Sequence, residues 1–439
     1  MSDLFAPLAQ KLATIRTNHP VGRVWKVAAG LITTRGLSQL ATVGDRVRIG
    51  PAAHLGEVIG LGKSALTILP EGGCTGIGVG DEVLLDGPVT LSPCQSWIGR
   101  IVDPLGRPLD GHPLFRGAVA LPVSRAAPPA AQRRRLGPRL QTGTTCFDTL
   151  LPIVRGQRVG LFAGSGVGKS SLLSQLARGV SADVVVIALV GERGRELREF
   201  VETTLGETGL ARSVVIAATS DQSPLLRRQC LLSAMTVAEY FRDQGQHVLF
   251  LADSVTRFAE AHREIALTAG EQPSLRGYPP SVQSAIMGLA ERAGPGIEAS
   301  GDITAVFSVL VPGSDMEEPI ADILRGVLDG HVVLDRTIAE RGRFPAIDLL
   351  RSVSRSLPWA ATAEENRLIA DARKVIATWE GAAMMVQAGL YPGGTGAMID
   401  PAIKSWPGLD PYLALNAPAN GIAGSFALLA QTLRGDQNR

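Results

Sequence analysis

The sequence predicts an α/β protein in which a mostly parallel sheet lies between an N-terminal β-barrel and a set of C-terminal helices. Three observations predict this organisation: short β-type runs fill residues 21–90, apolar strand-like runs alternate with helical patterns from about 145 to 350, and the chain turns helical after Pro358. Alternation of strands and helices is typical of βαβ units. The length of 439 residues agrees with a chain of several domains, at roughly 150 residues per domain.

The first segment, residues 1–20, is expected to be a short amphipathic helix. Its apolar side chains are spaced so that they share one helical face, and Pro20 ends the pattern. Because an isolated helix of this length is marginal in water, we expect it to dock on a partner or on the chain's own barrel. This apolar stripe consists of Phe5, Leu8, Leu12 and Ile15.

Residues 21–92 are expected to form the small β-barrel. Short β-type runs follow one another there and are separated by turn signals. The runs are VGRVWKV, GDRVRIG, EVIGLG, ALTILP and DEVLLDG. A later stretch rich in Pro, Ala and Arg, residues 122–140, is interpreted as a solvated connector, and its triple arginine 133–135 as solvated rather than bound to phosphate.

Residues 93–360 are expected to form the α/β core and residues 361–439 a helical domain. The strand-like runs of the core are RVGLF, VVVIALV, SVVIAA, HVLFLA and ITAVFSVLV. Shorter helices are expected at about 409–416 and 424–434, after a long helix. The face of that long helix is marked by Leu368, Ala372, Val375 and Trp379.

Composition excludes several functional classes. Lys and Arg number 43 and Asp and Glu 41, so the net charge of +2 gives no global field that would attract nucleic acid or a membrane surface. The four cysteines are scattered, as expected for reduced thiols in a cytosolic protein. No apolar run approaches the ~20 residues that span a bilayer, and the N-terminus lacks the pattern of a secretory signal. A secreted disulfide scaffold, an integral membrane protein and a generic basic nucleic-acid binder are excluded.

The strongest local signal is the stretch 158–176, RVGLFAGSGVGKSSLLSQL. An apolar strand runs into a glycine-rich loop that opens a helix, and the backbone N–H groups of such a P-loop cradle phosphate. We expect Lys169 to reach the β- and γ-phosphates and Ser170 to ligate Mg²⁺. Ala163 stands at the first motif position in place of glycine, which the turn should tolerate. The expected nucleotide-binding residues of the loop are Gly164, Ser165, Gly166, Val167, Gly168, Lys169, Ser170 and Ser171.

Two acids at strand ends favour a hydrolase over a protein that only binds nucleotide. Asp253 ends the run VLFLAD, which places its carboxylate at the edge of the sheet beside Mg²⁺. Glu192 follows the run VVVIALV, and a glutamate there can orient and deprotonate the water that attacks the γ-phosphate. A solvated charged turn is the alternative reading of the spacing around Glu192, because Arg193, Arg195 and Glu196 surround it.

Eight segments in the same order resemble the hexameric ATPases of type III protein export. The motifs LADSVTRFA and RGYPPS resemble those of the flagellar branch of this family. The family as a whole is similar to the β subunit of rotary ATP synthases. The resemblance implies a RecA-like P-loop ATPase core, with ATP and Mg²⁺ as ligands. The segments are WIGRIVDPLGRPLDG, RGQRVGLFAGSGVGKSSLL, VGERGRE, LADSVTRFAEAHRE, RGYPPS, GSDMEEPIAD, LDGHVVLDR and FPAIDLLRSVSR.

The resemblance also implies roles for single residues. Glu192 would be the catalytic base, and Arg193 and Arg257 would stand near the γ-phosphate. Arg355 would be an arginine finger that reaches the neighbouring subunit's site, a contribution worth roughly 10³–10⁵ in rate. In such a ring a single subunit alone would be nearly inactive.

Two aromatic residues are implied as adenine contacts. Phe344 stands where the family uses an aromatic ring to stack on adenine. Tyr391 is a candidate for the other face of the base, with ordinary core packing as the alternative. The sequence departs from the family pattern at 142–148 (TGTTCFD) and at 391–396 (YPGGTG). We therefore expect that the adenine pocket and the helical cap can differ from those of the family.

The partners implied by the resemblance are those of an export motor at the membrane. They are the other subunits of a homohexamer, a dimeric regulator at the N-terminal helix, a coiled-coil stalk in the central hole near 276–281 and 315–318, export chaperone–substrate complexes and the membrane export gate. The expected location is cytoplasmic and peripheral to the inner-membrane export apparatus, and no nucleic acid is expected.

Three alternative functions differ from this interpretation. A virulence-type secretion ATPase has the same catalytic core. A Rho-like nucleic-acid translocase needs interleaved aromatic and basic residues on an N-terminal RNA-binding fold, whereas residues 21–90 hold one Trp and neither Phe nor Tyr. A ring subunit that binds nucleotide without hydrolysing it should lack Lys169 or Glu192, and both are present.

Overall fold

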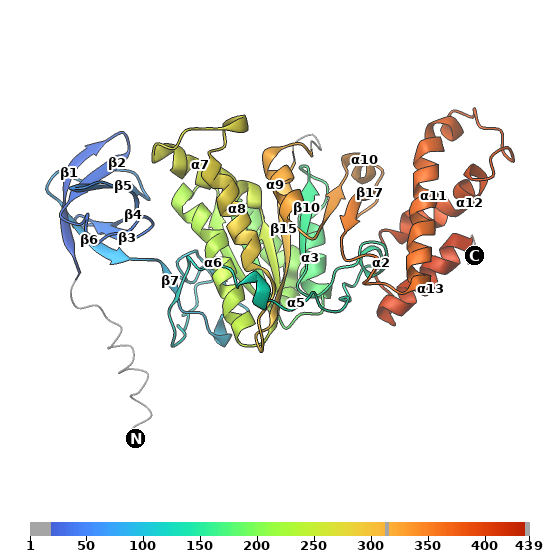
Figure 1. Cartoon of the computed structure of the whole chain (residues 1–439), viewed down its shortest axis with the longest axis horizontal. Coiled ribbons are helices and arrows are strands. Elements are labelled where there is room, and N and C mark those ends of the chain that lie inside the picture. The colour runs from blue at the N-terminus through green and yellow to red at the C-terminus, as the bar shows by residue number, and fades with distance from the viewer. Residues whose placement is uncertain (1–18, 312–315, 435–439) are drawn as a thin grey trace, which may run out of the picture.

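The computed structural model describes residues 19–311 and 316–434, and Figure 1 shows the whole chain. A barrel, a central α/β part and a helical part follow one another along the long axis of the molecule (Figure 1). The predicted fold class is therefore confirmed. The predicted N-terminal helix lies outside the described residues, with its stripe Phe5, Leu8, Leu12 and Ile15.

Six strands close the N-terminal barrel in the order β1-β2-β5-β4-β3-β6. Alternate side chains point inward, so the barrel has a core of its own that includes Val24, Ile32, Val47 and Ile68. The predicted barrel is thus confirmed. Its strands are β1 (Val21–Ala28), β2 (Leu31–Arg35), β3 (Arg46–Ile49), β4 (His54–Leu61), β5 (Ala65–Pro70) and β6 (Glu82–Gly87).

A nine-stranded sheet forms the centre in the order β17-β16-β10-β15-β13-β11-β12-β8, with β14 paired to β15. Neighbouring strands from β16 to β8 are parallel, so the carboxyl ends of β10, β11, β12, β13 and β15 meet at one edge. The strands are β8 (Ile101–Val102), β10 (Arg158–Ala163), β11 (Val184–Glu192), β12 (Ser213–Thr219), β13 (His247–Asp253), β14 (Gly294–Pro295), β15 (Asp302–Leu310), β16 (Gly330–Leu334) and β17 (Ile347–Ser354); a separate pair is β7 (Thr90–Leu91) and β9 (Leu121–Pro122).

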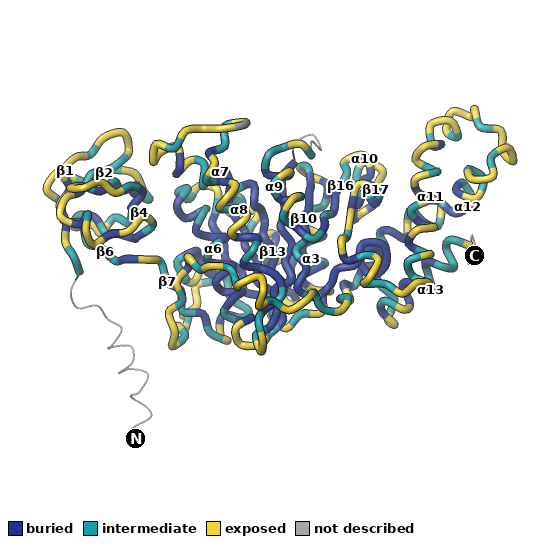
Figure 2. Tube along the Cα trace, in the orientation of Figure 1, coloured by how far each residue is buried: buried dark blue, intermediate teal, exposed yellow. Residues whose placement is uncertain are grey.

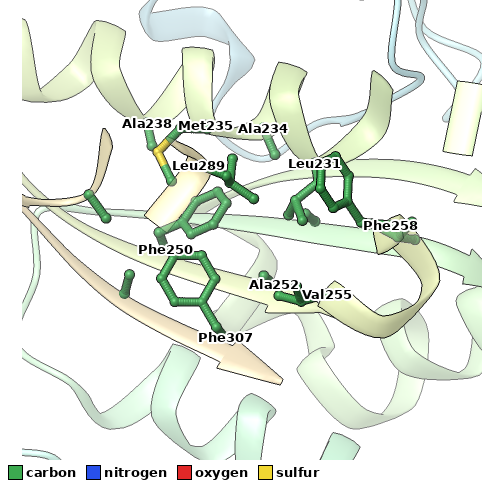
Figure 3. Packing of buried hydrophobic residues seen from close by; sticks show 14 of the residues in the cluster. Leu231, Ala234, Met235, Ala238, Phe250, Ala252, Val255, Phe258, Leu289 and Phe307 are labelled. Atoms are coloured by element: carbon green, nitrogen blue, oxygen red, sulfur yellow. The ribbon is translucent and has the colours of Figure 1, made fainter. Parts of the chain in front are cut away.

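Helices cover both faces of this sheet, which explains why its strands are apolar without alternation. On one face the rings of Phe250 and Phe307 lie 5.9 Å apart between centroids, near Met235 of α6 and Leu289 of α8 (Figure 3). Figure 2 shows the buried residues gathered in this central part. The helices are α2 (Thr145–Thr149), α3 (Lys169–Gly179), α4 (Gly194–Glu199), the π-helix η4 (Phe200–Leu205), α5 (Gly206–Leu210), α6 (Pro224–Asp243), α7 (Val255–Thr268), α8 (Pro280–Arg292), α9 (Pro319–Val327) and α10 (Arg336–Glu340), with short 3₁₀ turns η2 (Gln95–Trp97), η3 (Ala130–Gln132) and η5 (Leu275–Gly277).

The C-terminal helices confirm one prediction and correct another. The long helix is α11 (Ala363–Gln387), where Trp379 stacks on Trp406 with ring centroids 5.5 Å apart. The helix predicted at 409–416 is instead α12 (Ile399–Tyr412), which begins ten residues earlier. Pro407 and Pro411 lie inside it, and prolines argue against a helix in a sequence pattern. The last helix is α13 (Gly421–Arg434).

The stretch 122–140 is not the solvated connector that the sequence predicts. Arg133 donates to the carbonyl oxygens of Pro128 at 3.2 Å and Ala293 at 3.0 Å. Arg134 donates to Asp302 Oδ1 at 2.6 Å. These bonds fasten the segment to the amino edge of the sheet through Arg133 and Arg134, whereas Arg135 is exposed to water.

Among the described residues, no helix is both long and apolar enough to cross a lipid bilayer.

Candidate active site

The P-loop joins β10 to α3 at the carboxyl edge of the sheet. Gly166 and Gly168 have φ angles of 76° and 85°, a left-handed region that glycine enters without steric cost. A Cβ atom at Gly168 would lie 3.0 Å from Cδ1 of Phe344, so this position lacks room as well. The loop ends where α3 begins at Lys169, and the N-terminal N–H groups of that helix favour an anion.

A cavity of about 920 Å³ opens beside this loop. Its size and its mixture of backbone amides, hydroxyls and charged groups suit a nucleotide. Most of the predicted site residues line it: Gly164, Ser165, Gly166, Gly168, Lys169, Ser170, Ser171, Glu192, Arg193 and Arg257. Val167 differs, because its side chain is 2% exposed and packs in the hydrophobic core. Only its backbone is left for a ligand.

Lys169, which lines the cavity, meets Asp253, which does not line it. Lys169 Nζ is paired with Oδ1 of Asp253, and the hydroxyl of Ser308 donates to the same oxygen at 2.9 Å. Asp253 is 3% exposed, and a carboxylate this buried requires such partners. The pair lies where phosphate and a cation are expected, between the P-loop and the end of β13.

The donor set at this point fits magnesium. Ser170 and Asp253 supply a hydroxyl and a carboxylate oxygen, and Mg²⁺ prefers hard oxygen ligands, taking one or two carboxylates together with phosphates and water. No cluster of three His, Cys, Asp or Glu side chains able to hold a metal occurs in the described part of the chain. A cation would therefore depend on the phosphates of a bound nucleotide for further ligands.

Glu192 ends β11, the strand next to β13 in the sheet. Burial, helped by the nearby Asp253 carboxylate and opposed by Lys169, raises the pKa of the Glu192 carboxyl to about 7. A carboxyl with this pKa accepts a proton near neutral pH far better than an ordinary glutamate. Glu192 itself is partly buried, whereas its neighbours Arg193, Arg195 and Glu196 are exposed, so the solvated turn describes the neighbours but not the glutamate.

Three arginines surround this acid. Arg193 is 80% exposed in its side chain and lies 3.5 Å from a carboxylate oxygen of Glu196. Arg257 donates to Glu260 at 2.8 Å. Both line the cavity as predicted, and so does Arg227, which sequence reasoning missed.

The missed residues share one origin. Gly191 lies at the end of β11 and Glu196 follows that strand, Ser220 and Arg227 follow β12, and Leu310 and Val311 stand at the end of β15; all of them line the cavity at the carboxyl edge of the sheet. The signal that points to them is topological: side chains that follow neighbouring parallel strands gather at one edge. No local motif marks Arg227.

The two aromatic candidates lie in different places. Phe344 is half exposed and its ring stands beside Gly168 of the P-loop, although it does not line the cavity. Tyr391 does not line it either; its hydroxyl donates to Asp400 at 3.1 Å. Figure 1 shows the loop between α11 and α12 far from β10 and α3, because α11 carries it away from the core. The structure does not bring Tyr391 to the nucleotide cavity.

Arg355 lies away from the cavity of its own chain. β17 runs antiparallel to β16, with Ile347 beside Leu334 at one end and Ser354 beside Gly330 at the other. Leu334 in turn pairs with Ala163, the first residue of the P-loop motif. The start of β17 is therefore near the P-loop and its end is at the opposite edge of the sheet.

The separation is large. The eight residues of β17 span about 26 Å at roughly 3.3 Å per residue. At the far end Arg355 is exposed, and its Nη2 donates to the carbonyl oxygen of Arg325 at 3.1 Å. The side chain cannot act on the P-loop of its own chain, and it is available at the surface for another molecule.

Comparisons with known proteins agree with this geometry. The family model for the nucleotide-binding domain of the ATP synthase alpha/beta family matches residues 143–354. A flagellum-specific ATP synthase of Caulobacter vibrioides is 45% identical over 94% of this chain and 96% of its own length. One of Agrobacterium fabrum is also 45% identical, over 94% of this chain and 88% of its own length.

Solved structures lead to the same group of proteins. The assembled ATPase EscN in complex with its central stalk EscO, from the type III secretion system of enteropathogenic E. coli, is similar over 94% of this chain and 100% of the EscN chain. The TM-score is 0.86 at 34% sequence identity. The likeness covers barrel, core and helical part together.

Proposed function

The chain belongs to the family of flagellum-specific and type III secretion ATPases, and from this premise we propose that it forms a hexameric ring whose Mg²⁺-dependent ATP hydrolysis drives flagellar type III protein export. One observation supports the proposal of a ring: Arg355 stands at the edge of the sheet opposite its own P-loop. An arginine finger in that position serves the site of a neighbouring subunit. Each catalytic site then lies between two chains.

Different residues of the chain have different roles in hydrolysis. The P-loop amides, the N-terminus of α3 and Lys169 bind the phosphates. Glu192 orients the attacking water and takes its proton, for which its raised pKa suits it. Arg193 and Arg257, with Arg355 of the neighbouring subunit, stabilise the charge that develops on the phosphoryl oxygens.

Magnesium belongs to this proposal through Ser170 and Asp253. These two side chains would hold the ion, which would supply positive charge against the phosphates. Asp253 is held in place by Ser308, which keeps one carboxylate oxygen oriented. The donor chemistry of this pair supports the assignment.

The ring has a hole, and the similar EscN structure contains a central stalk. We propose a coiled-coil stalk for this protein too, in contact with the loops at 276–281 and 315–318. Of these, residues 276–281 and 316–318 are described, and they lie at the ends of α8 and α9.

The finer steps of export extend the proposal. ATP hydrolysis would release export chaperones, unfold their substrates and deliver them to the membrane export gate. Residues 1–20 would bind a dimeric regulator, and the ring would sit in the cytoplasm against the inner membrane. Deleting residues 1–17 tests the regulator site: regulator affinity should fall with the fold intact, and unchanged affinity would assign the segment to packing on its own barrel.

The flagellar branch is preferred over a virulence-type secretion ATPase. The two flagellum-specific relatives are 45% identical to this chain, whereas a type 3 secretion system ATPase of Xanthomonas euvesicatoria is 40% identical and EscN 34%. Removal of the gene should therefore stop flagellar assembly. Loss of a virulence secretion phenotype with flagella intact would reverse the assignment.

The activity itself is tested by a concentration series. ATP turnover per subunit should rise with protein concentration as rings assemble, because each site needs a neighbour's Arg355. Mass measurements on the same samples should show the rise and the ring together. A turnover that does not depend on concentration, measured down to monomer, would contradict the shared site.

A further inference from the structure

At the carboxyl edge of the sheet, β12 leads into α6. The first turn of α6 contains an arginine that has no role in the mechanism above. Arg227 stands four residues into α6 and lines the nucleotide cavity. Its Nε donates to the carbonyl oxygen of Gln222 at 3.2 Å, and its Nη2 to Glu264 of α7 at 3.1 Å. The side chain is 19% exposed. Two bonds thus hold a largely buried cation at the wall of the cavity.

The stem of this arginine lies against the residue before the catalytic base. A Cβ atom at Gly191 would be 3.7 Å from Cδ of Arg227 and 3.4 Å from Cβ of Arg257. The two arginines therefore pack over the same glycine, one residue before Glu192.

The order of strands says which part of a nucleotide Arg227 faces. The P-loop follows β10, Asp253 ends β13, Glu192 ends β11 and Arg227 follows β12, the next strand in the sheet. A nucleotide bound by the P-loop with its terminal phosphate toward Glu192 has that phosphate on the side of Arg227. Guanidinium has five N–H donors, so Arg227 can keep both of its bonds and still donate to phosphate.

The next residue faces the barrel. Arg228 is paired with Glu57 of β4, and both side chains are largely buried, at 17% and 5% exposed. Leu225, two residues before Arg227, packs with Ile59 of the barrel and Ile265 of α7. The first turn of α6 is thus fixed to the barrel on one side while it lines the nucleotide cavity on the other.

We propose that Arg227 binds the terminal phosphate of ATP and makes the site prefer ATP to ADP, and that the Arg228–Glu57 pair holds it in place from the barrel. The inference rests on the proposed function, since it needs ATP in this cavity. Loss of the terminal phosphate removes the partner of Arg227 while leaving the P-loop contacts intact. The barrel, through the first turn of α6, then helps to set nucleotide preference.

The test compares the affinities of a non-hydrolysable ATP analogue and of ADP by titration with a fluorescent nucleotide. In Arg227→Gln the affinity for the ATP analogue should fall roughly 10- to 100-fold, the effect of a lost charged hydrogen bond, with little change for ADP. Arg227→Lys should recover part of the preference. Glu57→Gln should lower the preference in the same direction by a smaller factor.

A matched control is available on the barrel. Arg23 also donates to a backbone carbonyl, Gly80 at 3.0 Å, and to a glutamate, Glu82 at 3.1 Å, but it lies outside the cavity. Arg23→Gln should keep the preference of the unmodified protein. Thermal unfolding of all variants separates lost binding from lost folding.

The outcomes are distinct. Equal loss of both affinities in Arg227→Gln would give the residue a structural role only and overturn the inference. An unchanged preference for the ATP analogue in Arg227→Gln would overturn the inference too. The proposed function is tested separately, because it stands as long as the unmodified protein hydrolyses ATP. An unchanged preference in Glu57→Gln would overturn the part assigned to the barrel.

Discussion

Lys169, the first residue of α3 and part of the cavity wall, is paired with Asp253, the last residue of β13. The two side chains are 11% and 4% exposed. β15 lies between β10 and β13 in the sheet, so the pair connects the P-loop to a strand two positions away. The fold thus brings together the lysine proposed to bind phosphate and the aspartate proposed to bind magnesium.

Removing the lysine should cost both binding and stability. In Lys169→Ala the nearly buried Asp253 keeps only Ser308 as a hydrogen-bond partner, and an uncompensated buried charge costs about 3 kcal/mol of unfolding free energy. Nucleotide binding should be lost. Urea denaturation measures the first effect and nucleotide titration the second.

The double variant Lys169→Ala/Asp253→Asn separates the two effects. It removes the stranded charge, so it should regain part of the stability but none of the nucleotide binding. Equal stability of the single and double variants would mean that the unpaired Asp253 carboxylate carries no cost in the folded protein.

Changing the proposed base should separate binding from turnover. Glu192→Gln keeps the size of the side chain but cannot accept the proton of water, so ATP should still bind while hydrolysis falls by about 10²–10⁴-fold. Glu196→Gln is the control, since Glu196 lines the same cavity four residues later. Undiminished hydrolysis in Glu192→Gln would move the role of base to another group.

The activity should depend on pH through the same carboxyl. Burial raises the pKa of Glu192 to about 7, and only the ionised form accepts a proton, so kcat/KM should fall about tenfold per pH unit below that value. Because Glu196 also raises this pKa, Glu196→Gln should move the midpoint to lower pH. A profile that is flat from pH 5.5 to 8, a window spanning roughly one unit and more on each side of that pKa, would exclude Glu192 as the titrating base.

The folded protein binds this proton more tightly than the unfolded chain does, since the pKa is raised on folding. The contribution of Glu192 to stability is thus present at low pH and is lost as pH rises through about 7. Denaturation of Glu192→Gln should lack this part of the pH dependence.

The glycine at the end of the P-loop should be sensitive to a single methyl group. Gly168 has φ of 85°, and an added Cβ would lie 3.0 Å from the ring of Phe344. Gly168→Ala should lower stability by about 1 kcal/mol or more and weaken nucleotide binding strongly. Gly342, also at positive φ (83°) but with open space around a Cβ, is the control: Gly342→Ala should lose stability to a similar backbone cost and keep binding.

Local pattern was sufficient for the parts of the fold that carry strong local signals. The strands β10, β11, β12, β13 and β15 were predictable because they are buried on both faces and read as unbroken apolar runs. The P-loop and Asp253 were predictable because strand, loop and helix stand together in the sequence. Each of these signals lies within about twenty residues.

The features that pattern missed depend on distant partners. Arg134 donates a hydrogen bond to Asp302, which is 168 residues away, and no pattern in the segment 122–140 indicates that partner. Arg227 reaches the cavity only because β12 lies beside β11. The predicted start of α12 is ten residues too late because Pro407, inside the observed helix, interrupts the helical pattern, whereas neighbouring helices hold the observed helix in place.

The central claim, that each site is completed by a second chain, is tested most directly by mixing two inactive variants. Lys169→Ala lacks a working P-loop but has Arg355; Arg355→Ala has the P-loop but lacks the finger. Mixed rings contain interfaces at which an intact P-loop meets an intact Arg355, so the mixture should hydrolyse ATP although neither variant does so alone. Activity that stays at the level of the separate variants, in mixtures shown by mass to form mixed rings, would contradict the shared site.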